Sequence, residues 1–144
     1  MTISYFTEDV KLPSKFPKRK LSKWIKEIAE NHQKEIESIV YVFCTNEEIL
    51  EINRQYLNHN FYTDIITFDY TKRHIINGEM YISLETVRSN SKMYQTKFAE
   101  ELYRVMIHGV LHLCGLKDNS VRLQKKMSWE EDIALKVLRT YIDF

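Results

Sequence analysis

Two histidines four residues apart are the feature of this sequence with the clearest chemical meaning. They stand in the stretch Met106–Asp118, which reads MIHGVLHLCGLKD. On a helix, His108 and His112 would lie on the same face, so both imidazoles can reach one ion. Gly115 supplies the left-handed residue that commonly ends a helix, after which the chain can return Asp118 to that ion. The predicted metal ligands are therefore His108, His112 and Asp118.

Three protein ligands leave one coordination position for water, which is the pattern of catalytic zinc sites rather than structural ones. We therefore predict one bound Zn²⁺, with manganese as an alternative because a carboxylate ligand tolerates harder ions. Zinc proteases of the H-E-x-x-H type carry their general base directly after the first histidine, where this chain has Gly109. A peptide hydrolase is therefore disfavoured. The non-functional alternative is a pair of histidines satisfied inside an apolar helix.

Length and composition are those of an ordinary globular chain. The 144 residues predict a single domain, 1–144, with 44% hydrophobic and 28% charged residues. A formal net charge of +1 does not indicate a strong affinity for nucleic acid. Cys44 and Cys114 form no disulfide framework, and neither a secretory leader nor a membrane-spanning run is visible, so we expect a cytoplasmic protein without membrane contact.

Hydrophobic periodicity and turn signals predict four strands and five helices. The strands are expected at 3–10, 38–44, 64–70 and 79–83, and the last two are expected to form a hairpin that turns at Asn77–Gly78. The helices are expected at 18–32, 45–56, 84–94, 97–113 and 121–142, with a loop over 58–62. This order predicts an α+β fold with one mixed four-stranded sheet and helices packed mainly on one face.

The two carboxyl-terminal helices have different expected environments. Helix 97–113 is apolar nearly all round, so it should be the buried central helix that carries the metal motif. In the last helix the predicted packing stripe includes Met127, Ile133 and Ala134, whereas the acidic run 130–132 is expected to face water. The most basic part of the chain, residues 11–26, is interpreted as a solvated surface, with an RNA-backbone patch as the alternative.

Five further residues have side chains that can hydrogen-bond or bind a metal. His59 and His74 are expected to be exposed rather than ligating. Asp64 is expected to make a structural hydrogen bond near the site, and Ser83 to cap the following helix. Glu79 is a candidate for hydrogen bonding to a ligating histidine, with a charge at the sheet edge as the alternative.

Four ordered segments of the chain resemble the YbeY family of bacterial rRNA maturation factors, which are metal-dependent endoribonucleases specific for single strands. The segments are N-x-x-Y at 53–56, TDIITF at 63–68, GEMYIS at 78–83 and HGVLHLCG at 108–115. Together they cover roughly residues 50–118, and the ends of the chain match only in element order. The resemblance implies the same activity here, in 16S rRNA maturation and ribosome quality control, with single-stranded rRNA and the small ribosomal subunit as partners.

Two positions depart from the pattern of that family. The family usually has a third histidine where Asp118 stands, and a carboxylate there keeps a ligand but lowers the net charge of the site. The family often has an arginine, considered important for catalysis, at the position of Leu57, which cannot clamp a phosphate. No residue beyond the metal site is identified as catalytic. Lys117 is the candidate that restores the missing positive charge, with a solvated turn lysine as the alternative.

The leading interpretation is therefore a zinc-dependent, single-strand-specific endoribonuclease. The alternative is a ribosome-assembly factor that binds RNA, holds a mainly structural metal and cleaves little; the residue Leu57 and the modest net charge both favour it.

Overall fold

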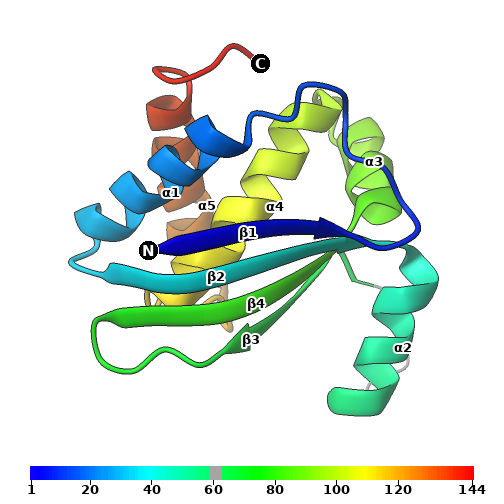
Figure 1. The fold of residues 1–144 in the computed structure, drawn as a ribbon, viewed down its shortest axis with the longest axis horizontal. Helices are drawn as coiled ribbons and strands as arrows, with labels where there is room; N and C mark the ends of the chain where they lie inside the picture. The colour runs from blue at the N-terminus through cyan, green and yellow to red at the C-terminus, as the bar shows by residue number, and fades with distance from the viewer. Residues whose placement is uncertain (59–62) are drawn as a thin grey trace.

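The structure is a computed structural model that describes residues 1–58 and 63–144. Its elements follow one another in the order β1 (Thr2–Thr7), α1 (Lys18–Asn31), β2 (Glu35–Cys44), α2 (Asn46–Tyr56), β3 (Ile65–Asp69), β4 (Ile75–Ser83), α3 (Leu84–Met93), α4 (Phe98–Leu113) and α5 (Val121–Leu138) (Figure 1). Most of the predicted loop at 58–62, with His59, lies outside the described residues.

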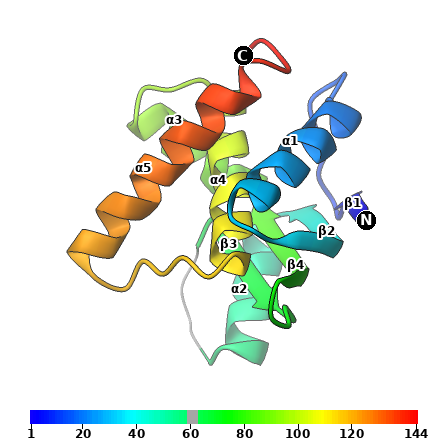
Figure 2. The same cartoon turned by 90° about the vertical axis from the view of Figure 1, so that its left-hand side faces the viewer.

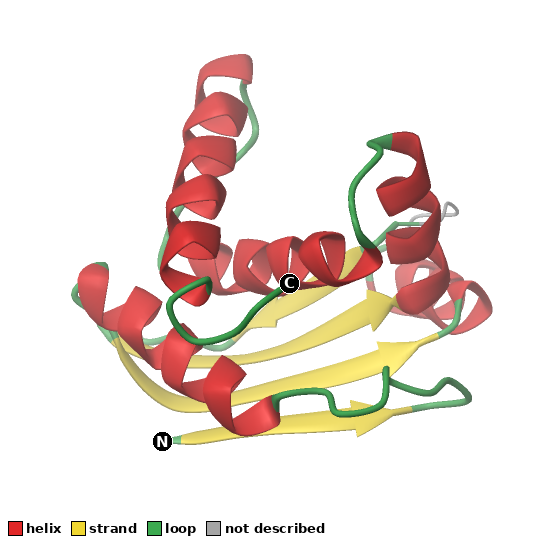
Figure 3. Cartoon of the chain, turned by 90° about the horizontal axis from the view of Figure 1, so that it is seen from above, coloured by secondary structure: helices red, strands yellow, loops and turns green. Residues whose placement is uncertain are grey.

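The four strands lie side by side in one mixed sheet of order β1-β2-β4-β3 (Figure 3). The strands β1, β2 and β4 run parallel, and the edge strand β3 pairs antiparallel to β4. The inner strand β2 is continuously apolar from Ile39 to Cys44, as expected of a strand covered on both faces. The predicted α+β fold with one mixed four-stranded sheet is confirmed.

The predicted turn at Asn77–Gly78 is wrong. Both residues belong to β4, where they pair with β2, and the chain turns earlier, between β3 and β4, where Lys72 bridges to Ile75. A Cβ at Gly78 would lie 2.8 Å from the Cδ1 atom of Leu113. The glycine therefore allows a helix to approach the sheet closely, which is a known use of glycine inside strands and is not a turn signal.

Helix α4 crosses the face of the sheet that also carries α1, and α5 lies alongside it (Figure 2). Ten of its sixteen residues are buried. Of the six others, Phe98 and Ala99 lie in the first turn, and four form a partly exposed stripe at intervals of four, namely Glu100, Arg104, His108 and His112. Helix α2 instead packs on the opposite face, against β3 and β4. The predicted buried central helix is confirmed, and both predicted metal-site histidines lie on its accessible stripe.

The last helix ends at Leu138, four residues before its predicted end, because the chain then folds into a turn in which the Ile142 amide donates to the Leu138 carbonyl. Ile133 was expected in the packing stripe but is 37% exposed.

Across the described residues, no helix combines the length and the apolar character needed to cross a membrane.

Gly109 fixes how closely α4 sits on the sheet beside the first histidine. A Cβ at this position would lie 2.1 Å from the Sδ atom of Met80 and 2.9 Å from the Cδ1 atom of Ile65. The substitution Gly109→Ala is therefore expected to lower the free energy of unfolding by about 1–3 kcal/mol, the usual cost of overpacking a core. Urea denaturation checks this, with Gly115→Ala as a contrasting variant whose cost comes from a backbone φ of +101° and not from a clash. A Gly109→Ala variant as stable as the parent would contradict the close packing.

Candidate metal centre

The end of α4 is built to reverse the chain toward the histidines. The Gly115 amide donates to the His112 carbonyl and the Leu116 amide to the Leu111 carbonyl, while Gly115 adopts a φ of +101°. These are the paired bonds of a Schellman motif, which needs a left-handed residue at this position. The predicted helix end at Gly115 is confirmed, and the returning segment brings Asp118 beside the helix.

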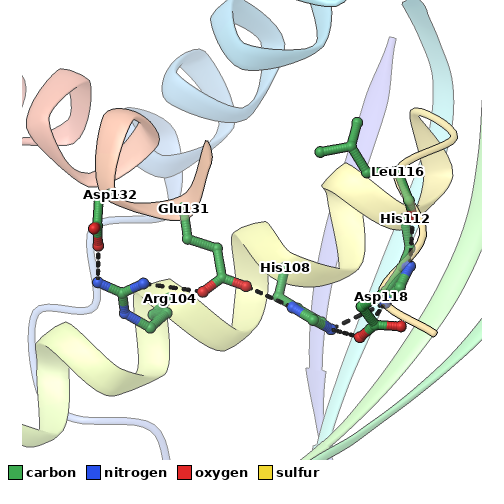
Figure 4. Close-up of polar contacts among 7 residues, drawn as sticks. All are labelled: Arg104, His108, His112, Leu116, Asp118, Glu131 and Asp132. Atoms are coloured by element: carbon green, nitrogen blue, oxygen red, sulfur yellow. Dashed lines mark hydrogen bonds and ion pairs between the residues drawn. The ribbon is translucent and has the colours of Figure 1, made fainter. Parts of the chain in front are cut away.

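Three side-chain atoms converge where the ligands were predicted (Figure 4). The two Nε2 atoms of His108 and His112 lie 3.0 Å apart. The Oδ2 atom of Asp118 lies 3.5 Å from the first and 3.4 Å from the second. Donors about 2.0–2.2 Å from a tetrahedral zinc ion are separated by roughly 3.3–3.6 Å. The three atoms therefore have nearly the spacing of one face of a zinc coordination shell.

The Nδ1 atom of each imidazole, on the side away from the converging atoms, is held by a hydrogen bond. The Nδ1 atom of His112 lies 2.9 Å from the Leu116 carbonyl oxygen, and that of His108 lies 2.6 Å from the Glu131 carboxylate. Both partners are acceptors, so each Nδ1 carries the proton and each Nε2 presents a lone pair. Two lone pairs that face each other at 3.0 Å repel unless a cation lies between them. This donor set fits a metal ion, and none of its tautomers needs to change to accept one.

The chain of contacts behind His108 continues through two further charged residues. Glu131 uses its second oxygen to accept from Arg104, at 2.9 Å, and Arg104 also pairs with Asp132 at 2.5 Å. Glu131 is buried, so the prediction that the whole acidic run 130–132 faces water is wrong at this position. The signal that was overlooked is periodicity: Glu131 follows the buried Met127 by four residues and so lies on the packing face of α5.

The electrostatics of the site follow from burial and these contacts. Burial lowers the pKa of His108, but the hydrogen bond and charge of Glu131, with the nearby carboxylates, outweigh it, so the pKa is raised overall. Burial raises the pKa of Asp64, and the charge of His108 partly opposes that shift. Asp64 lines, with the three predicted ligands and residues of β3, a cavity of about 530 Å³. The site is therefore an open acidic pocket at the edge of the sheet.

The other residues considered for the site do not join the three converging atoms. His74 and Lys117 are exposed. Leu57 is the exposed residue that directly follows α2. The candidate role of Glu79 behind a histidine is wrong, because its neighbours in β4, Gly78 and Met80, face α4 and alternation turns Glu79 to the opposite face.

Two predicted structural roles are confirmed. Ser83 caps α3 by accepting from the Thr86 amide. Asp64 makes local hydrogen bonds, including one at 3.5 Å from the Thr63 hydroxyl, and its backbone carbonyl accepts from the Ser83 amide. These contacts tie the start of β3 to the end of β4, beside the site.

Comparison with known proteins supports the same family as the sequence motifs. The family model described as Endoribonuclease YbeY matches residues 3–139. A protein of Parabacteroides distasonis named Endoribonuclease YbeY is 49% identical over 138 residues, covering 96% of each chain. One of the same name from Bacteroides fragilis is 48% identical over 135 residues, covering 94% of this chain and 96% of that one.

A solved structure shares the fold. The solution structure of TM1509 from Thermotoga maritima superposes with a TM-score of 0.66 at 25% identity, and the match covers 96% of this chain and 93% of that one. The histidine motif, the mixed sheet that supports it and the near full-length match of the family model agree, and this chain belongs to the endoribonuclease YbeY family.

Proposed function

We propose that this protein is a zinc-dependent endoribonuclease that cleaves single-stranded RNA during 16S rRNA maturation and ribosome quality control in the cytoplasm. Membership of the YbeY family supports the coarser statement that the chain is a hydrolase acting on RNA. Zinc, the single-strand preference and the small ribosomal subunit as partner belong to the proposal, as they did to the prediction from sequence.

The observation that carries the metal part is the convergence of the two Nε2 atoms and the Asp118 carboxylate in an open cavity. We assign His108, His112 and Asp118 as the ligands, with Zn²⁺ as the preferred ion because two imidazoles and one carboxylate match its usual donors. Manganese is the second choice, since the anionic oxygen of Asp118 suits a harder ion. A bound zinc ion would supply a water of lowered pKa and would polarise a phosphoryl oxygen.

The protein's own residues would orient this chemistry. Glu131 and the Leu116 carbonyl hold the two imidazoles so that both Nε2 atoms face the cavity. Asp64 stands in the wall of the same cavity, where a carboxylate can accept a hydrogen bond from a water molecule or an RNA hydroxyl. The single-strand preference is tested by offering the zinc-loaded protein one labelled RNA alone and annealed to its complement. Equal cleavage of both forms would contradict it.

Lys117 is proposed to supply positive charge for RNA near the site. It is exposed in the segment that returns Asp118, so it can meet a phosphate without loss of an internal contact. Lys117→Ala is expected to weaken single-stranded RNA binding several-fold and to leave zinc affinity unchanged, as measured by fluorescence anisotropy and by zinc titration. Lys125→Ala, which removes an exposed lysine from α5, is the control. Unchanged RNA affinity and cleavage in Lys117→Ala would remove the lysine from the proposal.

The second candidate function is a ribosome-assembly factor that binds RNA and cleaves little. The observation that favours it is Leu57, an apolar side chain at the end of α2 where the family resemblance implies an arginine. Binding to small ribosomal subunits that survives the combined change of His108 and His112 to alanine, with no cleavage by the zinc-loaded parent protein, would establish this alternative.

A further inference from the structure

A second cavity adjoins the metal pocket on the side away from the sheet edge. It has a volume of about 320 Å³, within the range of roughly 300–1,000 Å³ typical of small-ligand sites. It shares Asp64 and His108 with the metal pocket, so the two cavities meet at the first histidine. Its other walls come from three helices and the residue that follows the first of them, namely α3 (Asn90), Tyr94 directly after it, α4 (Glu101, Arg104, Val105) and α5 (Ser128, Glu131).

The most unusual residue of this second cavity is Glu101. The side chain is only 6% exposed, and no hydrogen bond or ion pair joins it to another residue in the described ranges 1–58 and 63–144, so its carboxylate oxygens face the solvent of the cavity. Burial raises the pKa of its carboxyl to about 7, although the nearby charge of Arg104 opposes that shift. The carboxylate therefore depends on water in the cavity for its hydrogen bonds, and a ligand that displaces this water must bring N–H donors of its own.

A metal ion fits this carboxylate poorly. Among the described residues, the only group of His, Cys, Asp and Glu atoms close enough to share an ion is the one formed by His108, His112 and Asp118. The neighbouring Glu131 carboxylate has both oxygens engaged, one with His108 and one with Arg104. A metal ion would therefore find too few ligands here, and with the Arg104 guanidinium already in the wall a neutral hydrogen-bond donor suits Glu101 better.

The walls of the cavity suit a flat heterocycle. Tyr94 is 60% exposed and lines the cavity, so its ring is available for stacking. The Asn90 amide and the Ser128 hydroxyl are further hydrogen-bonding groups in the walls. Proteins that read single-stranded RNA use this combination, in which an unstacked base lies against an aromatic ring and its edge is hydrogen-bonded.

We propose that this second cavity binds one unpaired RNA base next to the cleaved linkage, that the Glu101 carboxylate accepts hydrogen bonds from the edge of that base, and that guanine is preferred. The proposal rests on the proposed function. Guanine is the best match because its adjacent N1–H and N2–H groups can meet both carboxylate oxygens. Uracil is the poorest match, because its single N–H lies between two carbonyl groups.

The first test measures binding and is independent of cleavage. Fluorescence anisotropy of the zinc-loaded protein would compare a short oligouridylate with the same strand carrying one central guanosine. The guanosine strand is expected to bind roughly tenfold more tightly, the discrimination that one bidentate contact provides. Glu101→Gln, which keeps the shape of the side chain, should abolish most of this difference. Glu100→Gln, which removes the adjacent charge outside the cavity, should retain it.

Equal affinity for the two strands in the parent protein, or a guanosine preference that survives in Glu101→Gln, would overturn the proposal. Tyr94→Ala gives a second check: it should weaken binding of both strands while the preference remains, because stacking is nearly indifferent to base identity. The cleavage assay tests the proposed function, and the binding assay tests the base preference. Zinc-loaded protein that cleaves no single-stranded RNA would contradict the proposed function, and its guanosine preference would still be measured by binding. Where cleavage occurs, cuts should cluster at a fixed offset from guanosine in the parent and lose that bias in Glu101→Gln.

Discussion

Replacing His112 by alanine is expected to abolish stoichiometric zinc binding. The substitution removes one of three predicted ligands, and it also frees the Leu116 carbonyl that holds the imidazole. Because loss of even an outer partner of a ligand typically costs 10–100-fold in metal affinity, loss of a ligand should raise the dissociation constant by more than about 100-fold. Isothermal titration of the metal-free protein with zinc measures the change directly.

The matched control for this prediction is His74→Ala. His74 is an exposed imidazole in the turn before β4, so its removal should leave the titration unchanged. Zinc should also raise the melting temperature of the parent protein, since an ion that binds only the folded state stabilises it, and it should not raise that of the variant. A His112→Ala protein that still binds one zinc ion with the affinity of the parent would show that the ion lies elsewhere.

Replacing Glu131 by alanine is expected to cost about 10–100-fold in zinc affinity although this residue is not a predicted ligand. Its carboxylate lies 2.6 Å from the Nδ1 atom of His108 and fixes which nitrogen faces the cavity. Its loss also leaves Arg104 half-buried with one partner fewer. Glu131→Gln should fall between the parent and the alanine variant, because an amide oxygen can accept the same bond without the charge.

Asp132→Ala separates the two effects of that change. Asp132 contacts Arg104 but has no contact with His108, so its loss disturbs the arginine and leaves the imidazole oriented. Zinc affinity in this variant should stay within about twofold of the parent, the change typical of an exposed ion pair. Equal losses in Asp132→Ala and Glu131→Ala would show that the salt-bridge network as a whole, and not the bond to His108, supports the site.

The converging atoms could be predicted from sequence because all three residues belong to one continuous segment. Helical spacing brings His108 and His112 together. Gly115 predicts the chain reversal that brings Asp118 back beside them. Strand and helix types were predictable for a similar reason, since alternation, capping residues and apolar runs act over a few neighbouring positions.

Residues that depend on tertiary packing were not predictable in this way. Glu131 lies 23 positions from the histidine that it supports, and only the packing of α5 on α4 brings them together. Gly78 resembles a turn residue after an asparagine, yet its lack of a side chain serves the approach of Leu113. In the sequence, Glu101 looks like any glutamate of a helix, and only the packing of three helices encloses it.

Cleavage of a single-stranded, rRNA-derived RNA by parent and His112→Ala protein, side by side with added zinc or manganese, would show whether RNA is cut at this metal centre. We expect metal-dependent cleavage by the parent and its loss in the variant, which would locate the chemistry at His108, His112 and Asp118. Equal cleavage by both proteins would contradict the assignment of this site as the nuclease centre.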